Sequence, residues 1–453
     1  MSGRPPRRIR SSAHRFQLRR MDYAVVGRHM PQEGDPLRAQ RVALLAGCAL
    51  TVGALVLTTA LPAARPGAGA GDAPLVVVKQ SGALFARVDQ QLRPVANLAS
   101  ARLLLGSPEV PRLVDEAALD ELSGGPVLGI PGAPQSLGQV IEPAGARWAV
   151  CDDTAAVTTV SVADDAVPAN LDPHDAVLVA AAHGDGSVYL LYDGKRAAVD
   201  PSDPVTARTL HLGGVPVRKV SSTMLNAIPE VPGIGPPRIG GVGEPSGVAA
   251  VPIGTVLRVP RADSSEFYLV LAGGVQRVGA LAADLIRFAD PHSDGQIVTV
   301  APGFITDRPL LDALPLAAYP EQPPHIVDAG DVLCATWSSG RSGIAAGAGP
   351  SRGVTLAGSD GAGPGVDVVR VPPGRSLDVI ATMLTTDGGG AGRYLVNDAG
   401  VRFAVHDSAA AAALGLGAQP AAVPWAIIGA LPAGPELARD AALVARDVPA
   451  AAP

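Results

Sequence analysis

The feature that most constrains this chain is an apolar run at residues 42–61, twenty residues without a charged side chain or a proline. A helix of this length just crosses a bilayer core of about 30 Å. Because lipid offers no partner for exposed backbone amides, such a run is stable in a membrane only as a helix that satisfies its own hydrogen bonds. The run therefore predicts one membrane-spanning helix.

The charges on either side of this run predict its direction. Residues 1–41 contain ten arginines and three carboxylates, a net charge of +7, whereas only Arg65 lies between the run and Asp72. Positive charge stays on the cytoplasmic side, so we expect a single-pass protein of the cell (inner) membrane with residues 1–41 inside. The whole chain carries −6, which leaves −13 for residues 42–453 and argues against nucleic acid as a partner of the outer part.

Two alternative interpretations of the run were weighed. A cleaved signal has a short basic region and about 7–15 apolar residues, whereas here a long basic segment precedes a longer run. Residues 45–48, Leu-Ala-Gly-Cys, resemble a lipobox, in which the cysteine is acylated after cleavage. Thirteen more residues of the run follow Cys48, however, and this position favours a small residue inside a membrane helix.

The basic segment has a helical pattern of its own. Apolar residues recur at helical spacing among the arginines of residues 14–26, which predicts an amphipathic helix. Such a helix could lie on the inner leaflet or dock on a cytoplasmic partner, and the pattern does not choose between them. The candidate partner-binding residues of this segment are Arg15, Phe16, Leu18, Arg19, Arg20, Leu37 and Arg38.

The composition of the outer part predicts a turn-rich α+β fold that is mainly β. The chain has 53 Gly and 43 Pro but is 47% hydrophobic, which is too apolar for disorder and too interrupted for long helices. We expect a Pro/Gly/Ala linker at residues 62–74, an extracytoplasmic domain at 75–435 and an Ala/Pro-rich tail at 436–453.

Only two cysteines lie outside the predicted span, Cys151 and Cys334. Oxidation is permitted in that compartment, so we predict that they are joined. The alternative is a pair of buried free thiols.

A hairpin-helix layout occurs four times in the outer part. Each copy has a strand rich in aromatic and branched residues, a turn, a second short strand and a helical stretch. The leading strands are predicted at residues 84–88, 188–192, 267–271 and 393–397. The helices are predicted at residues 98–105, 204–212, 280–288 and 408–414, with Gly106, Gly213 and Gly415 as C-terminal caps. These copies predict four repeats around a central region, in a distorted propeller-like arrangement. Chance likeness between hairpins is the alternative.

Motifs that carry chemistry are absent from the sequence. The eight histidines are scattered without metal-ligand spacing, so no metal site is predicted. A phosphate-binding loop needs a glycine-rich turn followed by Lys and then Ser or Thr, but Lys195 continues into Arg196 within a predicted hairpin. Residues 233–235, Gly-Ile-Gly, begin like a dinucleotide fingerprint but continue into two prolines, in a stretch that we expect to be a linker. No catalytic residue is predicted.

Several blocks of sequence are shared with a known family. Two precede the predicted span, RFQLRRM at residues 15–21 and DPLRAQ at 35–40. The others follow it in order: SGAL at 81–84, LRPVANLASARL at 92–103, LGIPGAP at 128–134, VPW at 423–425 and LPAGP at 431–435. Together they resemble the EccB family, the single-span membrane component of actinobacterial type VII (ESX) secretion systems.

This resemblance implies an architectural role. EccB proteins assemble with the EccC motor ATPase, EccD and EccE into an inner-membrane core complex that exports WXG100-class proteins. Their outer domain is a quasi-twofold arrangement of four repeats around a central region, with a disulfide. The resemblance therefore implies a structural component of a multimeric secretion complex.

Enzymatic activity is implied by the resemblance alone. Some EccB proteins are described as ATPases, which would make ATP a cofactor. This sequence has no nucleotide motif, and its predicted compartment contains little ATP. We therefore expect a structural component without a cofactor, with an extracytoplasmic ATP hydrolase and a cell-wall-binding anchor as the alternatives.

Overall fold

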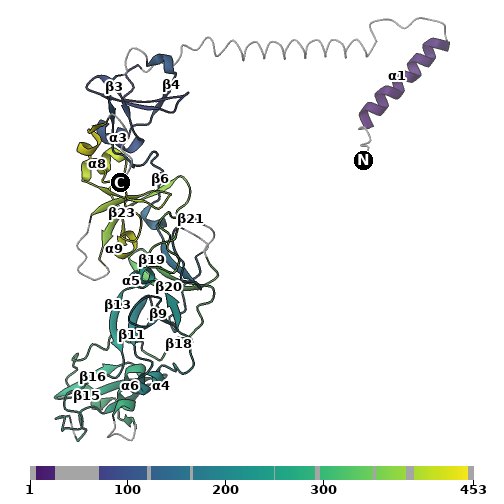
Figure 1. The fold of residues 1–453 in the computed structure, drawn as a ribbon. Coiled ribbons are helices and arrows are strands. Elements are labelled where there is room, and N and C mark those ends of the chain that lie inside the picture. Colours follow the sequence, from purple (N-terminus) through teal and green to yellow (C-terminus); the bar gives the residue numbers. More distant parts are fainter. Residues whose placement is uncertain are drawn as a thin grey trace. The chain divides into compact units, whose positions relative to one another are not determined.

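The computed structural model describes residues 7–25, 71–119, 124–163, 167–248, 250–290, 296–349, 353–383 and 392–446 (Figure 1). The chain divides into two compact units, Met1–Gly71 and Asp72–Pro453. The predicted span at residues 42–61 lies outside the described residues, so the structure does not test it. Among the residues that are described, no helix is both long and apolar enough to cross a bilayer.

The described part of the N-terminal unit is one helix, α1 (Arg7–Val25). It begins earlier than the predicted start at residue 14, because no glycine or proline interrupts the chain between Arg7 and Val25. Two apolar side chains of this helix are exposed to solvent: Leu18 is 49% and Met21 is 64% exposed. The helix is therefore formed without a described partner for its apolar side chains.

The outer domain, residues 72–453, contains four modules that share one order of elements (Figure 1). In each module three consecutive antiparallel strands are followed by a helix. A fourth strand then pairs in parallel with the first. All four predicted hairpins are present, and each forms the second and third strands of its module.

The first two modules flank the start of the central region in the sequence. The first module comprises β1 (Leu75–Val78), β2 (Leu84–Val88), β3 (Gln91–Val95), α3 (Leu98–Leu105) and β4 (Arg112–Val114). The second comprises β9 (Asp175–Ala181), β10 (Val188–Tyr192), β11 (Lys195–Val199), α4 (Pro204–Thr209) and β12 (Arg218–Val220). Two-residue turns join the hairpins, with Asp89 and Gln90 in the first module and Asp193 and Gly194 in the second at positive φ.

The other two modules follow the same order. The third module comprises β14 (Val256–Pro260), β15 (Ser265–Leu271), β16 (Gly274–Val278), α6 (Ala280–Ala289) and β17 (Val298–Thr299). The fourth comprises β23 (Arg375–Thr382), β24 (Arg393–Val396), β25 (Arg402–Val405), α8 (Ser408–Leu414) and β26 (Ala421–Pro424).

A separate six-stranded sheet, the central sheet, is built from segments that lie between modules in the sequence. Its strands in spatial order are β20 (Arg341–Gly347), β19 (Val332–Ser338), β7 (Trp148–Asp153), β8 (Thr158–Val162), β22 (Val368–Arg370) and β21 (Val354–Thr355). The neighbours β7 and β19 are antiparallel, although the second and third modules separate them in the sequence.

Short elements complete the outer domain. They are η2 (Glu116–Ala118), β5 (Val127–Leu128), β6 (Gln139–Val140), η3 (Pro143–Gly145), α5 (Ser222–Asn226), β13 (Glu230–Ile234), α7 (Gly303–Thr306), β18 (His325–Ile326), α9 (Trp425–Ile428), α10 (Arg439–Ala442) and β27 (Ala445–Arg446). The stretch around Gly233, expected to be a linker, is instead partly strand, because β13 pairs in parallel with β11.

The ends of the module helices follow from their capping residues. Asn97, Asp203 and Asp407 each accept a hydrogen bond from a backbone N–H of the first turn. Gly106 and Gly415 are C-terminal caps with φ of 67° and 82°, as predicted. The predicted cap Gly213 is wrong: α4 ends earlier, with Leu210 as its cap, and His211 adopts a φ of 57°.

Shared hydrophobic clusters give the order in which the modules pack. The central sheet shares one cluster with the second and fourth modules, represented by Val150, Leu191 and Val379. The first module packs on the fourth, with helix α3 against α8. The third module packs on the second, with helix α6 against α4. The domain is thus mainly β, as expected, with its helices at the contacts between paired modules.

The C-terminal boundary of the domain differs from the prediction of a tail from residue 436. Leu437 and Ala442 have no exposed surface, and β27 pairs with β5 beside the first module. Leu437 and Ala442 thus belong to the core shared by the first and fourth modules. The packed domain extends to Arg446, and residues 447–453 lie outside the described residues.

Candidate functional site

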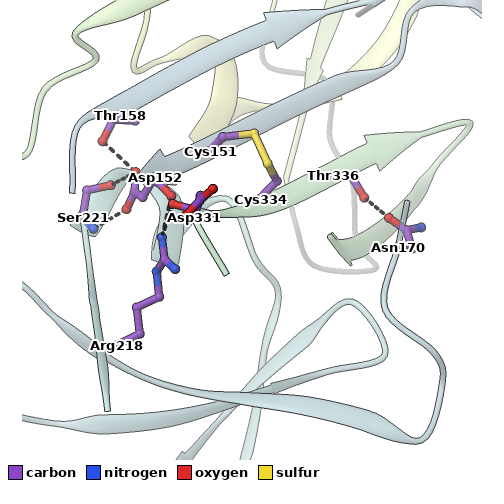
Figure 2. The surroundings of a disulfide bond; sticks show 9 residues. All are labelled: Cys151, Asp152, Thr158, Asn170, Arg218, Ser221, Asp331, Cys334 and Thr336. Carbon is purple, nitrogen blue, oxygen red and sulfur yellow. Dashed lines mark hydrogen bonds between the residues drawn. A yellow bond between two sulfur atoms is a disulfide. The ribbon is translucent and has the colours of Figure 1, made fainter. Parts of the chain in front are cut away.

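The predicted disulfide is confirmed and lies in the central sheet. Cys151 of β7 and Cys334 of β19 are directly opposite each other in the antiparallel register, with a Cα–Cα distance of 4.0 Å (Figure 2). Both cysteines are buried, beside Ala149, Val332 and Ala345. The bond joins residues 183 positions apart, and the loop that it closes contains the second and third modules.

The residue after Cys151 is a buried carboxylate. Asp152 has no exposed surface and accepts hydrogen bonds from the Ser221 N–H (2.5 Å), the Ser221 hydroxyl (3.1 Å) and the Thr158 hydroxyl (2.9 Å), which Figure 2 shows. Burial raises the pKa of this carboxyl, although the hydrogen bonds and the charge of Arg218 act in the opposite direction. Since Ser221 caps α5, which follows the second module, Asp152 fixes that helix to the central sheet.

Arg218, from β12 of the second module, also connects this module to the central sheet. Its guanidinium donates to the backbone oxygens of Gly330 (2.5 Å), Asp152 (3.1 Å) and Asp331 (3.1 Å). These oxygens lie on β7 and on the turn before β19, next to the two cysteines. We call Asp152, Thr158, Arg218 and Ser221 the junction residues, because they join the second module to the disulfide-bonded strands.

Thr158 links this junction to a second buried carboxylate. Its backbone N–H donates to Asp367 (2.8 Å), which also accepts from the Ser359 hydroxyl and from the N–H groups of Asp360 and Gly361. Burial alone would raise the pKa of Asp367, but these hydrogen bonds outweigh it and lower that pKa. Both carboxylates thus hold Thr158, the first residue of β8: its hydroxyl donates to Asp152 and its N–H donates to Asp367.

The junction residues could not be predicted from a sequence motif, because they lie far apart in the sequence and match no known pattern. The sequence contains a weak signal: Asp152 directly follows four apolar residues, Trp148 to Cys151, the last of which is a cysteine. A buried carboxylate needs hydrogen-bond donors, but the sequence does not indicate that Ser221 supplies them.

The structure places the tested nucleotide motifs in ordinary secondary structure. Gly194 and Lys195 form the β10–β11 turn region, and the Lys195 Nζ is 3.0 Å from a carboxylate oxygen of Asp193. A surface pocket of about 360 Å³ beside Lys195 is also lined by Glu321. Within the described ranges, no group of His, Cys, Asp and Glu is arranged to hold a metal ion.

A groove of about 510 Å³ lies between the ends of β23, α5 and α9. It is lined by uncharged residues, among them Thr223, Met383, Trp425 and Ala430. Trp425, 38% exposed, belongs to the sequence block at residues 423–425, and the Arg402 guanidinium lies 5.0 Å from its ring centre. The groove is suited to apolar groups, and none of the described residues that line it carries a charge for a phosphate.

The predicted partner-binding residues lie on the other unit of the chain. Arg15, Leu18, Arg19 and Arg20 are exposed on α1, and Phe16 belongs to the same helix. Leu37 and Arg38 lie outside the described residues. Their role in binding stays a prediction.

Fold and site together define a class of protein: a basic N-terminal helix and an apolar run, followed by a disulfide-bonded, mainly β domain of modules without an evident catalytic centre among its described residues. A sequence model of the family described as "Type VII secretion system ESX-1, transport TM domain B" matches residues 4–451. The chain belongs to this family, EccB, as its sequence blocks predicted.

Curated relatives and solved structures agree with this membership. The chain is 33% identical to the ESX-3 secretion system ATPase EccB3 of Mycolicibacterium smegmatis, over 96% of this chain and 90% of that protein. It is 31% identical to the ESX-5 secretion system ATPase EccB5 of Mycobacterium tuberculosis, over 97% and 93%.

Two solved structures have the same fold. A chain of an intact ESX-5 inner membrane complex aligns with a TM-score of 0.68 at 29% identity, over 99% of this chain and 97% of that one. An EccB3 dimer from the ESX-3 core complex aligns with a TM-score of 0.69 at 31% identity, over 82% and 100%.

Proposed function

We propose that this protein is a structural component of a type VII secretion inner-membrane complex and supports the export of WXG100-class proteins. The observation that carries the proposal is the alignment of 99% of the chain with a chain of an intact ESX-5 inner membrane complex. Its partners are then the EccC-, EccD- and EccE-type proteins of the same complex. The likeness to an EccB3 dimer supports assembly with a second copy of this chain.

We further propose that residues 42–61 form its single membrane span, with residues 1–41 in the cytoplasm and the domain from residue 75 outside. The support is the net charge of +7 before the run and the single arginine that follows it before Asp72. A disulfide between Cys151 and Cys334 agrees with an oxidising compartment for the outer domain.

The four modules are proposed to be repeats of one ancestral unit. Their common order of strands and helix, including the parallel fourth strand, supports this origin over chance likeness. Their packing supports two pairs on either side of the central sheet, first with fourth and second with third, rather than a closed propeller-like ring.

Deleting residues 1–41 tests the proposed role, because this segment is the part of the chain proposed to lie on the cytoplasmic side, where the EccC-type motor ATPase acts. We expect the deletion to abolish co-purification with the EccC-type motor ATPase, while the outer domain keeps its melting temperature. Co-purification from native membranes followed by mass spectrometry measures the first effect, and calorimetry of residues 72–446 the second. Full co-purification of the deleted protein would contradict the assembly role of this segment.

ATP hydrolysis is a second candidate function, favoured by the word ATPase in the names of the relatives. Against it, Lys195 is paired with Asp193, and the Glu321 carboxylate of the same pocket lies 3.8 Å from the Arg277 guanidinium, so these charges are balanced without a phosphate. If the protein is a scaffold, ATP turnover by the purified outer domain should fall with further purification and should be unaffected by Lys195→Ala. Turnover that tracks the protein and is lost in a point variant would establish the enzyme.

A further inference from the structure

The exposed arginines of α1 lack partners in the structure. Arg15, Arg19 and Arg20 are all exposed, and no described carboxylate pairs with them. The whole helix contains six arginines and one acid, Asp22, so its net charge is +5. A helix of this net charge is attracted to an anionic surface.

An apolar stripe runs beside two of these arginines. Leu18, Met21 and Val25 are spaced three and four residues apart, so they share one face of the helix, and they are 49%, 64% and 86% exposed. Arg15 and Arg19 lie about 60° and 100° around the helix from Leu18, both on the side of the stripe away from Met21. Arg20 lies about 100° from Met21, on the other side of the stripe, so arginines border the stripe on both sides.

We propose that α1 lies on the anionic inner surface of the membrane, with Arg15 and Arg19 on lipid phosphates and the Leu18–Met21–Val25 stripe between the headgroups. This inference rests on the proposed span. Only sixteen residues separate Val25 from the start of the run at residue 42, so α1 stays within about 55 Å of the bilayer.

This tether favours lipid over an acidic protein as the occupant. Anionic headgroups surround the span at high local concentration whether or not the other proteins of the complex are bound. Juxtamembrane arginines attract such headgroups, and each one near the surface raises binding about fivefold. An exposed apolar stripe bordered by arginines is also suited to a lipid interface. The long arginine side chains reach the phosphates there, while the apolar side chains are buried between the headgroups.

The test uses the full chain in nanodiscs of phosphatidylcholine alone or of an equal mixture with phosphatidylglycerol. Hydrogen exchange of the backbone amides of residues 14–25 is the readout, because docking stabilises the helix. We expect exchange to be slower in the anionic discs, and this slowing to disappear at high salt. Arg15→Gln with Arg19→Gln should abolish most of it, a loss of about twenty-fivefold in binding.

Three matched variants separate the contributions of the positive charge, of the two sides of the stripe and of the apolar stripe itself. Arg15→Lys with Arg19→Lys keeps the charge and should keep most of the slowing. Arg20→Gln removes one charge from the other side of the stripe and should weaken the slowing about as much as Arg19→Gln does. Met21→Gln leaves every charge in place and should weaken it by removing part of the stripe.

The outcomes distinguish this inference from the proposal on which it rests. If residues 42–61 exchange as freely as exposed chain, the proposed span fails. If they are protected but residues 14–25 exchange equally in both kinds of disc, α1 does not bind the lipid. Slowing that requires the other proteins of the purified complex, whatever the lipid, would make α1 a protein-docking helix and overturn the inference.

Discussion

Replacing Cys151 with serine is expected to lower the free energy of unfolding of the outer domain by about 5 kcal/mol at most, and by about 2–5 kcal/mol in practice. The upper figure follows from the length of the loop that the bond closes, since its cysteines are 183 residues apart. Without the bond, the unfolded chain regains the freedom of the whole segment that contains the second and third modules. Denaturant unfolding of residues 72–446 measures the difference.

Two controls make this result specific. Cys48→Ser in the full chain changes a cysteine outside the outer domain and should leave its melting temperature unchanged. Reduced wild type should unfold like Cys151→Ser, and Cys334→Ser should match it, because each change removes the same bond. Equal stability of oxidised wild type and either variant would show that the loop contributes nothing.

The second large effect is expected at the junction residues. Asp152→Ala leaves the buried N–H of Ser221 and two hydroxyls without their acceptor, which should cost about 3 kcal/mol. Asp152→Asn keeps an oxygen for the Ser221 N–H and removes a buried charge, so its loss should be much smaller. Asp312→Ala, at an exposed position, is the control and should be nearly neutral.

The pH dependence of the same variants tests the state of the carboxyl. Because burial raises the pKa of Asp152 in the folded protein, its contribution to stability is largest below the unfolded pKa of about 3.9 and is lost as pH rises through the folded value. The stability of wild type relative to Asp152→Asn should therefore fall as pH rises from about 4. A relative gain over this range would mean that the donors and Arg218 outweigh burial.

Local elements of this fold were predictable because their signals are local. Asp193 and Gly194 specify a two-residue turn, and Gly106 and Gly415 end helices where a left-handed residue is needed. Gly213 is not a cap, because α4 already ends at Thr209 with Leu210 as its cap. The disulfide followed from the number and compartment of the cysteines, without any knowledge of the strands that carry them.

The longer-range arrangement was not predictable from one sequence. The parallel strands β4, β12, β17 and β26 have two to four residues each, too few for a periodic pattern, and their pairing depends on the helix that precedes them. The meeting of Asp152 with Ser221 is a contact across 69 positions that no composition signals. Likewise, the Ala-rich stretch before Arg446 resembles a free tail until the first module provides a core for Ala442.

The bond between β7 and β19 also determines how the outer domain would carry a mechanical load. Tension applied between Asp72 and Arg446 passes along the chain to Cys151, crosses directly to Cys334 and continues to the C-terminal part. The 182 residues between the two cysteines lie outside this covalent path, because the disulfide acts as a shortcut around them. The first and fourth modules and every strand of the central sheet except β8 lie on this path and would bear the pull, while the second and third modules would stay folded without load.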